Sequence, residues 1–337
     1  MWRRLASGLV ITTIGAGVGA ARLLSGLMLA RPPEEITAVV NTGDDLVLHG
    51  LAISPDLDTV TYTLAGAVNA ETGWGLTGET WRAMQALDRY GGQTWFRLGD
   101  LDLATHLYRT QRRSEGATLS EVSGEIARAW GLELNLLPMS DDPVRTVLTI
   151  AEGEISFQDY FVARRHGVAV SAVRFQGADE AHPAPGVLEA LATAEAVVIC
   201  PSNPIVSIAP VLAVPGIREA VTARRENTVA ISPIVAGAAL KGPADRLLAE
   251  LGHEASVVGV ARLYAPLAAA LVIDPADAAL AGAVEAEGMR AVVVPSIMSS
   301  PEAARRLAEA ALAAAGAAGS SGAAGSSGAA GSSGAAG

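Results

Sequence analysis

Short apolar runs alternate with amphipathic stretches along most of the chain, and they are the first guide to its fold. Each run is followed by glycine, proline, asparagine, serine or aspartate, the residues that commonly follow buried strands. The runs cover residues 9–14, 36–40, 134–139, 196–200, 228–231, 270–273 and 291–294. The stretches between them have helical periodicity. The pattern therefore predicts an α/β fold with a Rossmann-like, mostly parallel sheet flanked by helices.

Two segments interrupt this alternation. From about residue 60 to 130 the pattern is helical without a strong strand, which predicts a largely helical insertion with helices near 60–68, 79–88, 102–113 and 118–130. Residues 144–150, 155–158 and 168–175 are separated by turn signals and predict antiparallel strands. We interpret residues 8–315 as a single catalytic α/β domain. From residue 316 to 337 the repeat AAGSSG predicts a flexible linker or tail.

Composition narrows the class of protein. Half of the 337 residues are hydrophobic, enough for one large core, and the net charge is −11 with a pI near 5.0. An acidic chain does not bind nucleic acid through a basic surface, so we expect no nucleic-acid partner. The single cysteine, Cys200, excludes an internal disulfide and a thiolate metal cluster, and it fits the reducing cytoplasm.

The N-terminus permits two interpretations. Two arginines at residues 3 and 4 precede an apolar run, as in a signal peptide, and the stretch to Ala30 is long enough to imitate a membrane span. Arg22 interrupts that stretch, and glycine is frequent in it. We interpret it as a strand over residues 9–14, a glycine turn and a helix from about Ala20, with no membrane association. The signal peptide remains the alternative.

A cluster of carboxylates follows the strand that ends at Val40. Asp44, Asp45, Asp56 and Asp58 lie within fifteen residues of one another, together with His49. Neighbouring carboxylates repel each other unless a cation or a proton intervenes, so the cluster indicates a divalent-metal or polar-substrate site at a strand's carboxyl end. The alternative is two solvated turns in which aspartate forms turns and caps a helix.

A glycine-rich turn joins the first predicted strand to the first predicted helix. Gly15, Gly17 and Gly19 would allow a phosphate to approach backbone N–H groups at the helix N-terminus, and Arg22 could add a charge-assisted bond. Alanine stands at residue 16. The alternative is a tight turn without a ligand.

Polar residues also follow the strand that ends at Cys200. Ser202 and Asn203 stand between two prolines, where ligands bind in open parallel sheets. Cys200 is interpreted as a core residue rather than a nucleophile. Lys241, before a predicted helix, could meet a phosphate or be a surface lysine.

Two further pairs have two interpretations each. His106 and Arg109 are three residues apart on one helical face, where they could contact an anionic substrate or form a solvated face. Asp141 and Asp142 follow another strand and could extend the acidic site or form a plain turn.

An ordered set of motifs resembles one family, the 2-phospho-L-lactate transferases of deazaflavin coenzyme F-420 biosynthesis, with their actinobacterial relatives that use phosphoenolpyruvate. The set spans most of residues 11–294, in family order. It comprises VNTGDD at 40–45, HG at 49–50, ISPDLDT at 53–59, GWG at 73–75, LGD at 98–100, DLATH at 102–106, LPMSDDP at 137–143, PSNPI at 201–205 and SPI at 232–234.

The resemblance implies the activity. Such an enzyme transfers a phosphate-bearing three-carbon acid, as 2-phospho-L-lactate or enolpyruvyl phosphate, from a guanosine diphosphate conjugate to a ribityl hydroxyl of the deazaflavin Fo. GMP is released, Mg²⁺ assists, and a cytoplasmic homodimer is expected. Which three-carbon acid the donor carries stays open.

The resemblance also implies roles for residues. Asp44, Asp45 and Asp58 would be catalytic, with Asp44 and Asp58 as Mg²⁺ ligands. Fo would be contacted by Asp58, Thr59, Arg97 and His106. The guanosine diphosphate half would face the glycine turn with Arg22 and the loop with Ser202 and Asn203, as nucleotides do at a switch point.

The chain departs from the family pattern at three positions, with Ala16 and Ala20 in place of glycines and Leu101 in place of an arginine. Two other functions compete. A related family with this fold binds nucleotide sugars and regulates without catalysis. An NAD-dependent dehydrogenase would rest on the glycine turn alone.

Overall fold

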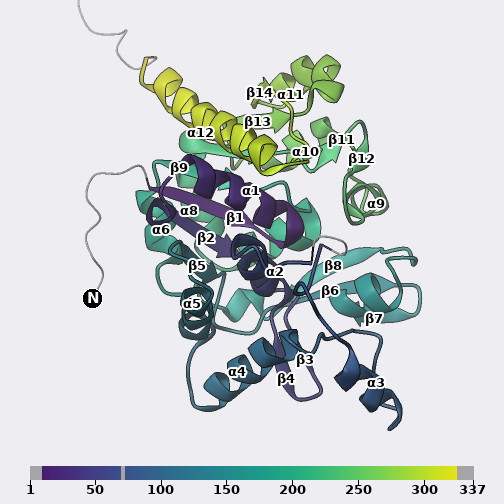
Figure 1. The fold of residues 1–337 in the computed structure, drawn as a ribbon. Coiled ribbons are helices and arrows are strands. Elements are labelled where there is room, and N and C mark those ends of the chain that lie inside the picture. Colours follow the sequence, from purple (N-terminus) through teal and green to yellow (C-terminus); the bar gives the residue numbers. More distant parts are fainter. Residues whose placement is uncertain (1–9, 70–72, 325–337) are drawn as a thin grey trace, which may run out of the picture.

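Seven parallel strands form the central sheet of the computed structural model, which describes residues 10–69 and 73–324 (Figure 1). Their order is β14-β13-β10-β9-β1-β2-β5, and every neighbouring pair is parallel. The predicted parallel α/β fold is thereby confirmed. The strands are β1 (Ile11–Gly15), β2 (Ile36–Val40), β5 (Asn135–Pro138), β9 (Ala196–Ile199), β10 (Thr228–Ile231), β13 (Ala270–Ile273) and β14 (Arg290–Val293).

The order of the strands reverses at β1, which pairs with β2 on one side and with β9 on the other. Loops leaving the carboxyl ends of adjacent strands diverge at such a switch point and leave a crevice between them. The glycine turn follows β1, the acidic stretch follows β2, and the loop with Ser202 follows β9. The topology therefore places three of the predicted motifs around one opening.

Helices cover both faces of the sheet, and each face has its own hydrophobic core. One core is built mainly from α1 (Gly17–Ala30), α2 (Pro55–Leu64), α5 (Leu119–Ala129) and α12 (Pro301–Ala324). The other is built from α6 (Val187–Thr193), α7 (Ala209–Ala213), α8 (Ile217–Ala223), α10 (Val257–Tyr264) and α11 (Ala281–Ala286), with α9 (Ala244–Glu250) at its edge. Strands β1, β2, β9, β10 and β13 are fully buried because of this double cover, which explains their mainly apolar sequences, whereas the edge strand β14 is partly exposed.

Helices α1 and α12 lie side by side although they are far apart in the sequence (Figure 1). A Cβ at Gly26 of α1 would lie 2.3 Å from the carbonyl oxygen of Ala304, so only glycine permits this close approach. Helix α12 ends at Ala324, eight residues beyond the predicted boundary at Gly316. The remaining tail, 325–337, and the N-terminal residues 1–9 of the signal-peptide alternative lie outside the described residues.

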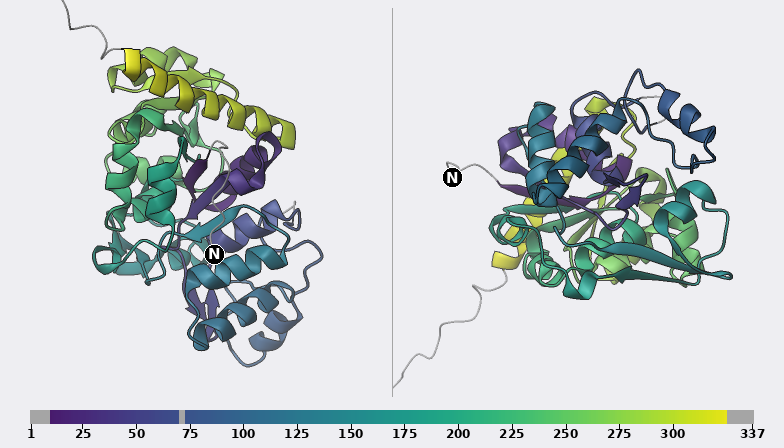
Figure 2. Two further views of the ribbon diagram at one scale, coloured as in Figure 1. Left: turned by 90° about the vertical axis from the view of Figure 1, so that its left-hand side faces the viewer. Right: turned by 90° about the horizontal axis from the view of Figure 1, so that it is seen from below.

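The segment between β2 and β5 projects from one end of the sheet, away from α12 (Figure 2). It contains the predicted helices, as α2, α3 (Arg82–Asp88), α4 (Asp102–Ser114) and α5, and α5 begins with a capping box between Thr118 and Glu121. It also contains a hairpin that was not predicted, β3 (Leu46–Leu48) and β4 (Leu51–Ile53). The hairpin turns at His49 and Gly50, both with positive φ, and packs on Met84 and Leu98.

A three-stranded antiparallel sheet flanks the same end of the molecule, as the sequence predicts. It has the order β7-β6-β8 and consists of β6 (Arg145–Ile150), β7 (Gly153–Ser156) and β8 (Ala172–Gln176). A short hairpin of β11 (Ile234–Val235) and β12 (Ala238–Ala239) follows β10. In the described part of the chain, no single helix is long and apolar enough to cross a membrane. Only Pro204–Ala213 and Ile217–Ala223 together, bent by 98°, reach that length and composition.

Candidate functional site

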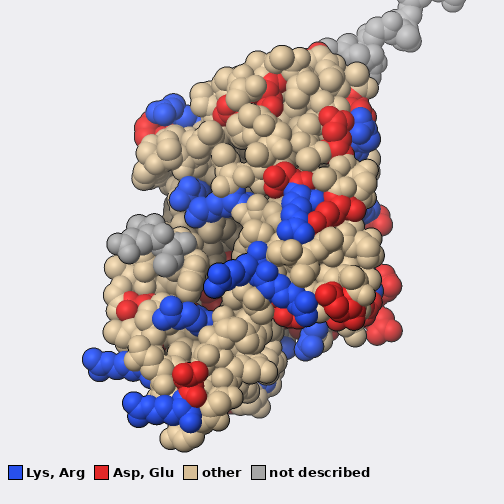
Figure 3. All heavy atoms as spheres, turned by 90° about the vertical axis from the view of Figure 1, so that its right-hand side faces the viewer, with Lys and Arg blue, Asp and Glu red and all other residues tan. Residues whose placement is uncertain are grey.

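A cleft of about 900 Å³ opens at the carboxyl ends of β1, β2 and β9. Its walls come from the glycine turn, the start of α2, the insertion, the antiparallel sheet and the segment between β12 and α9. Figure 3 shows this face hollowed between two bulkier parts, with Lys and Arg side chains gathered along the hollow. The cleft is large enough for two substrates, and its walls carry both charged and aromatic groups.

The glycine turn packs directly on the loop after β9. A Cβ at Gly19 would lie 2.4 Å from the carbonyl oxygen of Pro201, so glycine is required there by packing alone. Gly15 is equally confined, since its Cβ would lie 2.6 Å from that of Ala20. Gly17, at φ +61°, has open space beyond it except for Asp56 Oδ1 at 3.6 Å. The turn is therefore both a packing element and an open approach to the N-terminus of α1.

Ser202 and Asn203 line the cleft, but their side chains organise the loop itself. The Ser202 hydroxyl accepts a hydrogen bond from Ala16 N at 3.1 Å and donates one to Ala16 O at 2.8 Å. Asn203 Oδ1 accepts from the backbone N–H of Ile205 at 2.9 Å. Arg22, predicted to meet a phosphate, lines the cleft and donates to the carbonyl of Met298 at 3.4 Å.

The floor of the cleft carries two neighbouring carboxylates, Asp44 and Asp56. Asn41 Nδ2 donates to Asp56 Oδ2 at 3.0 Å, whereas Asp44 Oδ1 is buried with no hydrogen-bond partner in the described structure. Burial raises the pKa of Asp44 well above its usual range, and the charges of Asp56 and Asp45 raise it further. Burial likewise raises the pKa of Asp56 to about 6. Two oxygen ligands with an unmet need for positive charge fit a hard divalent cation such as Mg²⁺.

Asp56 was not among the predicted site residues, although it belongs to the acidic stretch. It lies in the first turn of α2, two positions before Asp58, so the two side chains leave the helix on different sides. Asp45 lies behind the floor, where its Oδ2 accepts from Ser54 Oγ at 2.6 Å, and it does not line the cleft. Burial raises the pKa of Asp45 as well. The spacing of residues along α2, read as a helix from Pro55, could have separated Asp56 from Asp58.

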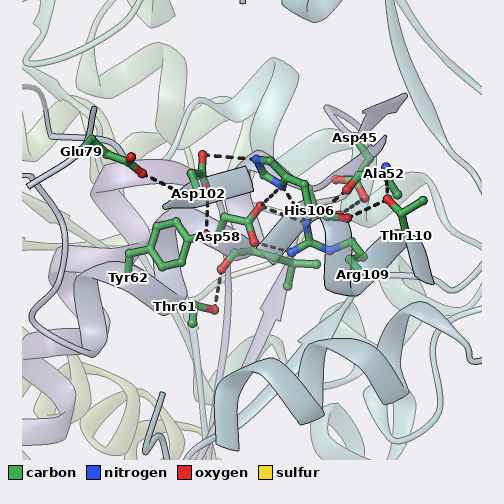
Figure 4. A network of polar contacts seen from close by, with 12 residues as sticks. Asp45, Ala52, Asp58, Thr61, Tyr62, Glu79, Asp102, His106, Arg109 and Thr110 are labelled. Atoms are coloured by element: carbon green, nitrogen blue, oxygen red, sulfur yellow. Dashed lines mark hydrogen bonds and ion pairs between the residues drawn. The ribbon is translucent and has the colours of Figure 1, made fainter. Parts of the chain in front are cut away.

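Asp58 belongs to a separate, buried network (Figure 4). Arg109 of α4 holds it with two guanidinium nitrogens; Nη2 lies against Oδ1, and Nη1 is 3.1 Å from Oδ2. His106 Nδ1 is 3.7 Å from Asp58 Oδ2, and His106 Nε2 is 3.2 Å from Asp102 Oδ2. Tyr62 donates to Asp102 Oδ1 at 2.6 Å. Asp58 is therefore a carboxylate already neutralised by a buried cation.

The alternative of a solvated face for His106 and Arg109 is wrong, because their exposed fractions are only 2% and 1%. Burial alone would lower the pKa of Arg109, but the charge of Asp58 raises it above its ordinary value. Burial would raise the pKa of Asp102, yet hydrogen bonds from His106 and Tyr62 keep it lower than usual. The network thus pairs its buried charged groups with one another inside the protein.

Asp58, Asp102 and His106 offer ligand atoms within 4.8 Å of one another, which makes a second group that could hold a metal. The Arg109 guanidinium already neutralises Asp58, and a dication beside it would be repelled. Asp44 and Asp56 have no such cation. The structure therefore favours Asp44 with Asp56 as the metal-binding pair, whereas the sequence paired Asp44 with Asp58.

Aromatic side chains line the other end of the cleft. The Arg97 guanidinium lies 4.2 Å from the ring centroid of Trp81, and Phe157 and Phe161 stack with centroids 5.3 Å apart. Arg97, Phe157 and Phe161 all line the cleft, and Thr59 does so from α2. Flat apolar surfaces beside a cation suit a planar, polar ring system.

Three other candidates from the sequence are structural. Asp141 accepts from the backbone and the hydroxyl of Ser120 at 2.6 and 2.8 Å, and Asp142 accepts from His182 at 2.8 Å, so the pair forms a turn outside the cleft. Cys200 is buried in the core, and burial raises its pKa to about 12, so its thiol stays protonated.

Comparison with known proteins identifies the family of the chain. The family model "2-phospho-L-lactate transferase CofD" matches residues 11–307. A phosphoenolpyruvate transferase of Kitasatospora aureofaciens is 46% identical over 312 residues, covering 90% of this chain and 97% of that protein. A 2-phospho-L-lactate transferase of Methanosarcina mazei is 39% identical over 293 residues, covering 87% of this chain and 96% of that protein.

Among solved structures, a UPF0052 family protein of Bacillus halodurans, BH3568, superposes with a TM-score of 0.60 over 91% of this chain and all of the other, at 17% identity. That likeness extends to the fold alone. The family match over residues 11–307, with identities of 39–46% across about nine-tenths of the chain, shows that the chain belongs to the 2-phospho-L-lactate transferase family.

Proposed function

We propose that this transferase moves a phosphate-bearing three-carbon acid from a guanosine diphosphate conjugate to a ribityl hydroxyl of the deazaflavin Fo in coenzyme F-420 biosynthesis. The hydroxyl oxygen bonds to the phosphorus that bears the acid, the bond between the two phosphates breaks, and GMP leaves. The observation that carries the proposal is a cleft in which Asp56 lies beside Gly17 of the glycine turn, while the Asp44 carbonyl accepts from Gln158, next to Phe157 of the aromatic wall. We assign the donor to the glycine turn, the reacting diphosphate to Asp44 and Asp56, and the acceptor to the aromatic wall.

The donor half is assigned to the switch point. The turn at Gly17 and the side chain of Arg22 face the cleft from α1, where backbone N–H groups and a guanidinium favour an anion. Asp44 and Asp56 are the residues that would hold Mg²⁺, which when bound would neutralise charge on the diphosphate. Both must be ionised to do so.

The acceptor half is assigned to the insertion and the antiparallel sheet. Asp58, held by its ion pair with Arg109, would accept a hydrogen bond from an Fo hydroxyl and so orient it for attack. Thr59, His106 and Arg97 line the same end and complete the predicted Fo contacts. Homodimer formation and a cytoplasmic location stay predictions.

Incubation of the purified protein with Fo, Mg²⁺ and each guanylylated acid, followed by mass spectrometry, tests the function. Enolpyruvyl donor is the first to test, because several relatives at 43–46% identity are named phosphoenolpyruvate transferases. A phosphodiester of Fo together with GMP is expected. Binding of a UDP-sugar or of NAD without any Fo product would count against the proposal and for a regulator or a dehydrogenase.

The raised pKa of Asp56 gives a pH-dependent prediction. Because its folded-state pKa is raised from 3.8 to about 6, its favourable contribution to stability is present below pH about 4 and is lost as pH rises through about 6. Mg²⁺ at about 100 times its Kd is therefore expected to raise Tm by about 5 °C at pH 8 and hardly at all at pH 5. Scanning fluorimetry with and without Mg²⁺ measures both shifts.

The Asp56→Asn variant is the control for that measurement, since it removes the charge and keeps the shape. Its Tm at pH 8 is expected to respond far less to Mg²⁺ than that of the native chain. An equal Mg²⁺ response in the two proteins, or an equal response at pH 5 and pH 8, would remove Asp56 from the metal site.

A further inference from the structure

Lys241 is the only lysine in the chain, in which the other cationic side chains are all arginines. It stands between β12 and α9 and lines the same cleft as the acidic floor. The proposed roles of the cleft residues leave it unused. A single lysine in this position raises the question of which anionic group it meets.

The ammonium group of Lys241 reaches toward the opposite wall. A Cβ at Gly73, in the insertion, would lie 2.8 Å from Lys241 Nζ, so the missing side chain makes room for the ammonium. On its own wall, a Cβ at Gly242 would lie 3.8 Å from Cε2 of Phe161, which places the lysine segment over the stacked phenylalanines. The Lys241 ammonium therefore lies in the cleft next to the insertion, on a segment that contacts the aromatic wall at Phe161.

Within residues 10–69 and 73–324, no carboxylate forms an ion pair with Lys241. Two other cleft cations are likewise without an acidic partner there. Arg22 contacts only the carbonyl of Met298, beside the glycine turn, and Arg97 stacks on Trp81 at the aromatic end. A cation that faces a cleft without an internal partner is available to an anionic ligand.

The negative groups of the proposed donor can be matched to these cations. The diphosphate belongs with the glycine turn, Arg22 and the metal pair, and Arg97 lies at the Fo end. The remaining negative group is the carboxylate of the three-carbon acid, which the donor's covalent structure puts beyond the diphosphate from the guanosine. Resting on the proposed function, we propose that Lys241 binds this carboxylate and thereby selects donors that carry an acid.

Lysine suits this position better than arginine. Its ammonium is a compact point charge, whereas a guanidinium is a wide planar fork. With Gly73 approaching so closely, the larger group would have to displace the insertion. Lys241→Arg is therefore expected to restore only part of the donor affinity that Lys241→Met removes.

The experiment measures donor binding by calorimetry without Fo, using a guanylylated acid and the matched carboxamide, which has the same shape and no charge. The native protein is expected to bind the acid about 10- to 100-fold more tightly than the carboxamide, the range of one charge-assisted contact. Lys241→Met is expected to lose that difference while its affinity for GDP stays unchanged. Arg89→Met, at an exposed cation outside the cleft, is the matched control and should behave like the native chain.

Each outcome either supports or overturns the assignment of Lys241 to the carboxylate. Equal loss of GDP and donor affinity in Lys241→Met would place the lysine on the diphosphate and overturn the inference. Preserved discrimination between acid and carboxamide would overturn it as well. Tight, carboxylate-dependent binding without transfer to Fo would defeat only the proposed function, whereas a protein that binds no guanylylated acid would defeat both.

Discussion

Replacing Arg109 by methionine is expected to lower the free energy of unfolding by about 3–5 kcal/mol, the cost of leaving a buried charge without its partner. Arg109 is among the largest fully buried side chains, and its guanidinium neutralises Asp58. Methionine fills similar space but offers no charge, so Asp58 must be protonated or hydrated in the variant. Urea unfolding at pH 7.5 measures this loss of stability. The Arg109→Met variant is also expected to bind Fo more weakly.

Two variants make this result specific. Arg112→Met removes a half-buried arginine of the same helix, which pairs with Glu115 and Glu125, and a smaller loss is expected because solvent partly screens these pairs. Asp58→Leu combined with Arg109→Met removes both charges and is expected to be more stable than Arg109→Met alone. A loss for Arg109→Met no greater than for Arg112→Met would show that Asp58 does not depend on the buried cation.

The central sheet could be predicted because the apolar sequence of each strand is visible without knowing its neighbours. Strands such as Ala196–Ile199, with both faces covered, are apolar at every position, and the pattern needs no knowledge of the partner strand. The hairpin Leu46–Ile53 could not be recognised in the same way. Its two strands have only three residues each and are partly exposed. They are stabilised by packing on Met84 and Leu98, which are distant in sequence.

The candidate site could be predicted only in outline. The sequence indicated that the acidic stretch, the glycine turn and the loop after Cys200 each follow a strand of the parallel sheet, and the structure brings all three to one cleft. It did not show which carboxylates are neutralised. Arg109 lies 51 positions from Asp58, and a polar helix face gives no sign of whether another element will bury it. The division of the aspartates is therefore a tertiary property.

That division has a functional consequence. Asp58 is held in place by its ion pair with Arg109, which suits a residue that orients a neutral hydroxyl. Asp44 and Asp56 lack an internal cation, and their raised pKa values show that the folded protein does not stabilise their charges by itself. A bound metal would stabilise them. One acidic stretch thus supplies two environments, one for the acceptor and one for the metal and diphosphate.

The largest effect on catalysis is expected from Asp56→Asn. Charge neutralisation at a transferring phosphate contributes several kcal/mol, so transfer to Fo should fall about a thousandfold at physiological Mg²⁺ concentrations. The fold should be preserved, because asparagine can still accept the hydrogen bond from Asn41. Steady-state kinetics across a Mg²⁺ titration, with Fo binding measured separately, separates metal loss from acceptor loss.

Asp45→Asn is the matched control, since Asp45 belongs to the same acidic stretch but lies outside the cleft, bound to Ser54. Its turnover is expected to stay within about tenfold of the native value, the size of a single neutral hydrogen bond. Asp58→Asn should instead weaken Fo binding and leave the Mg²⁺ dependence unchanged. The carboxylates that bind the cation must control the apparent affinity for Mg²⁺. If Asp58→Asn lost the Mg²⁺ dependence of turnover and Asp56→Asn kept it, Asp58 and not Asp56 would be the metal ligand.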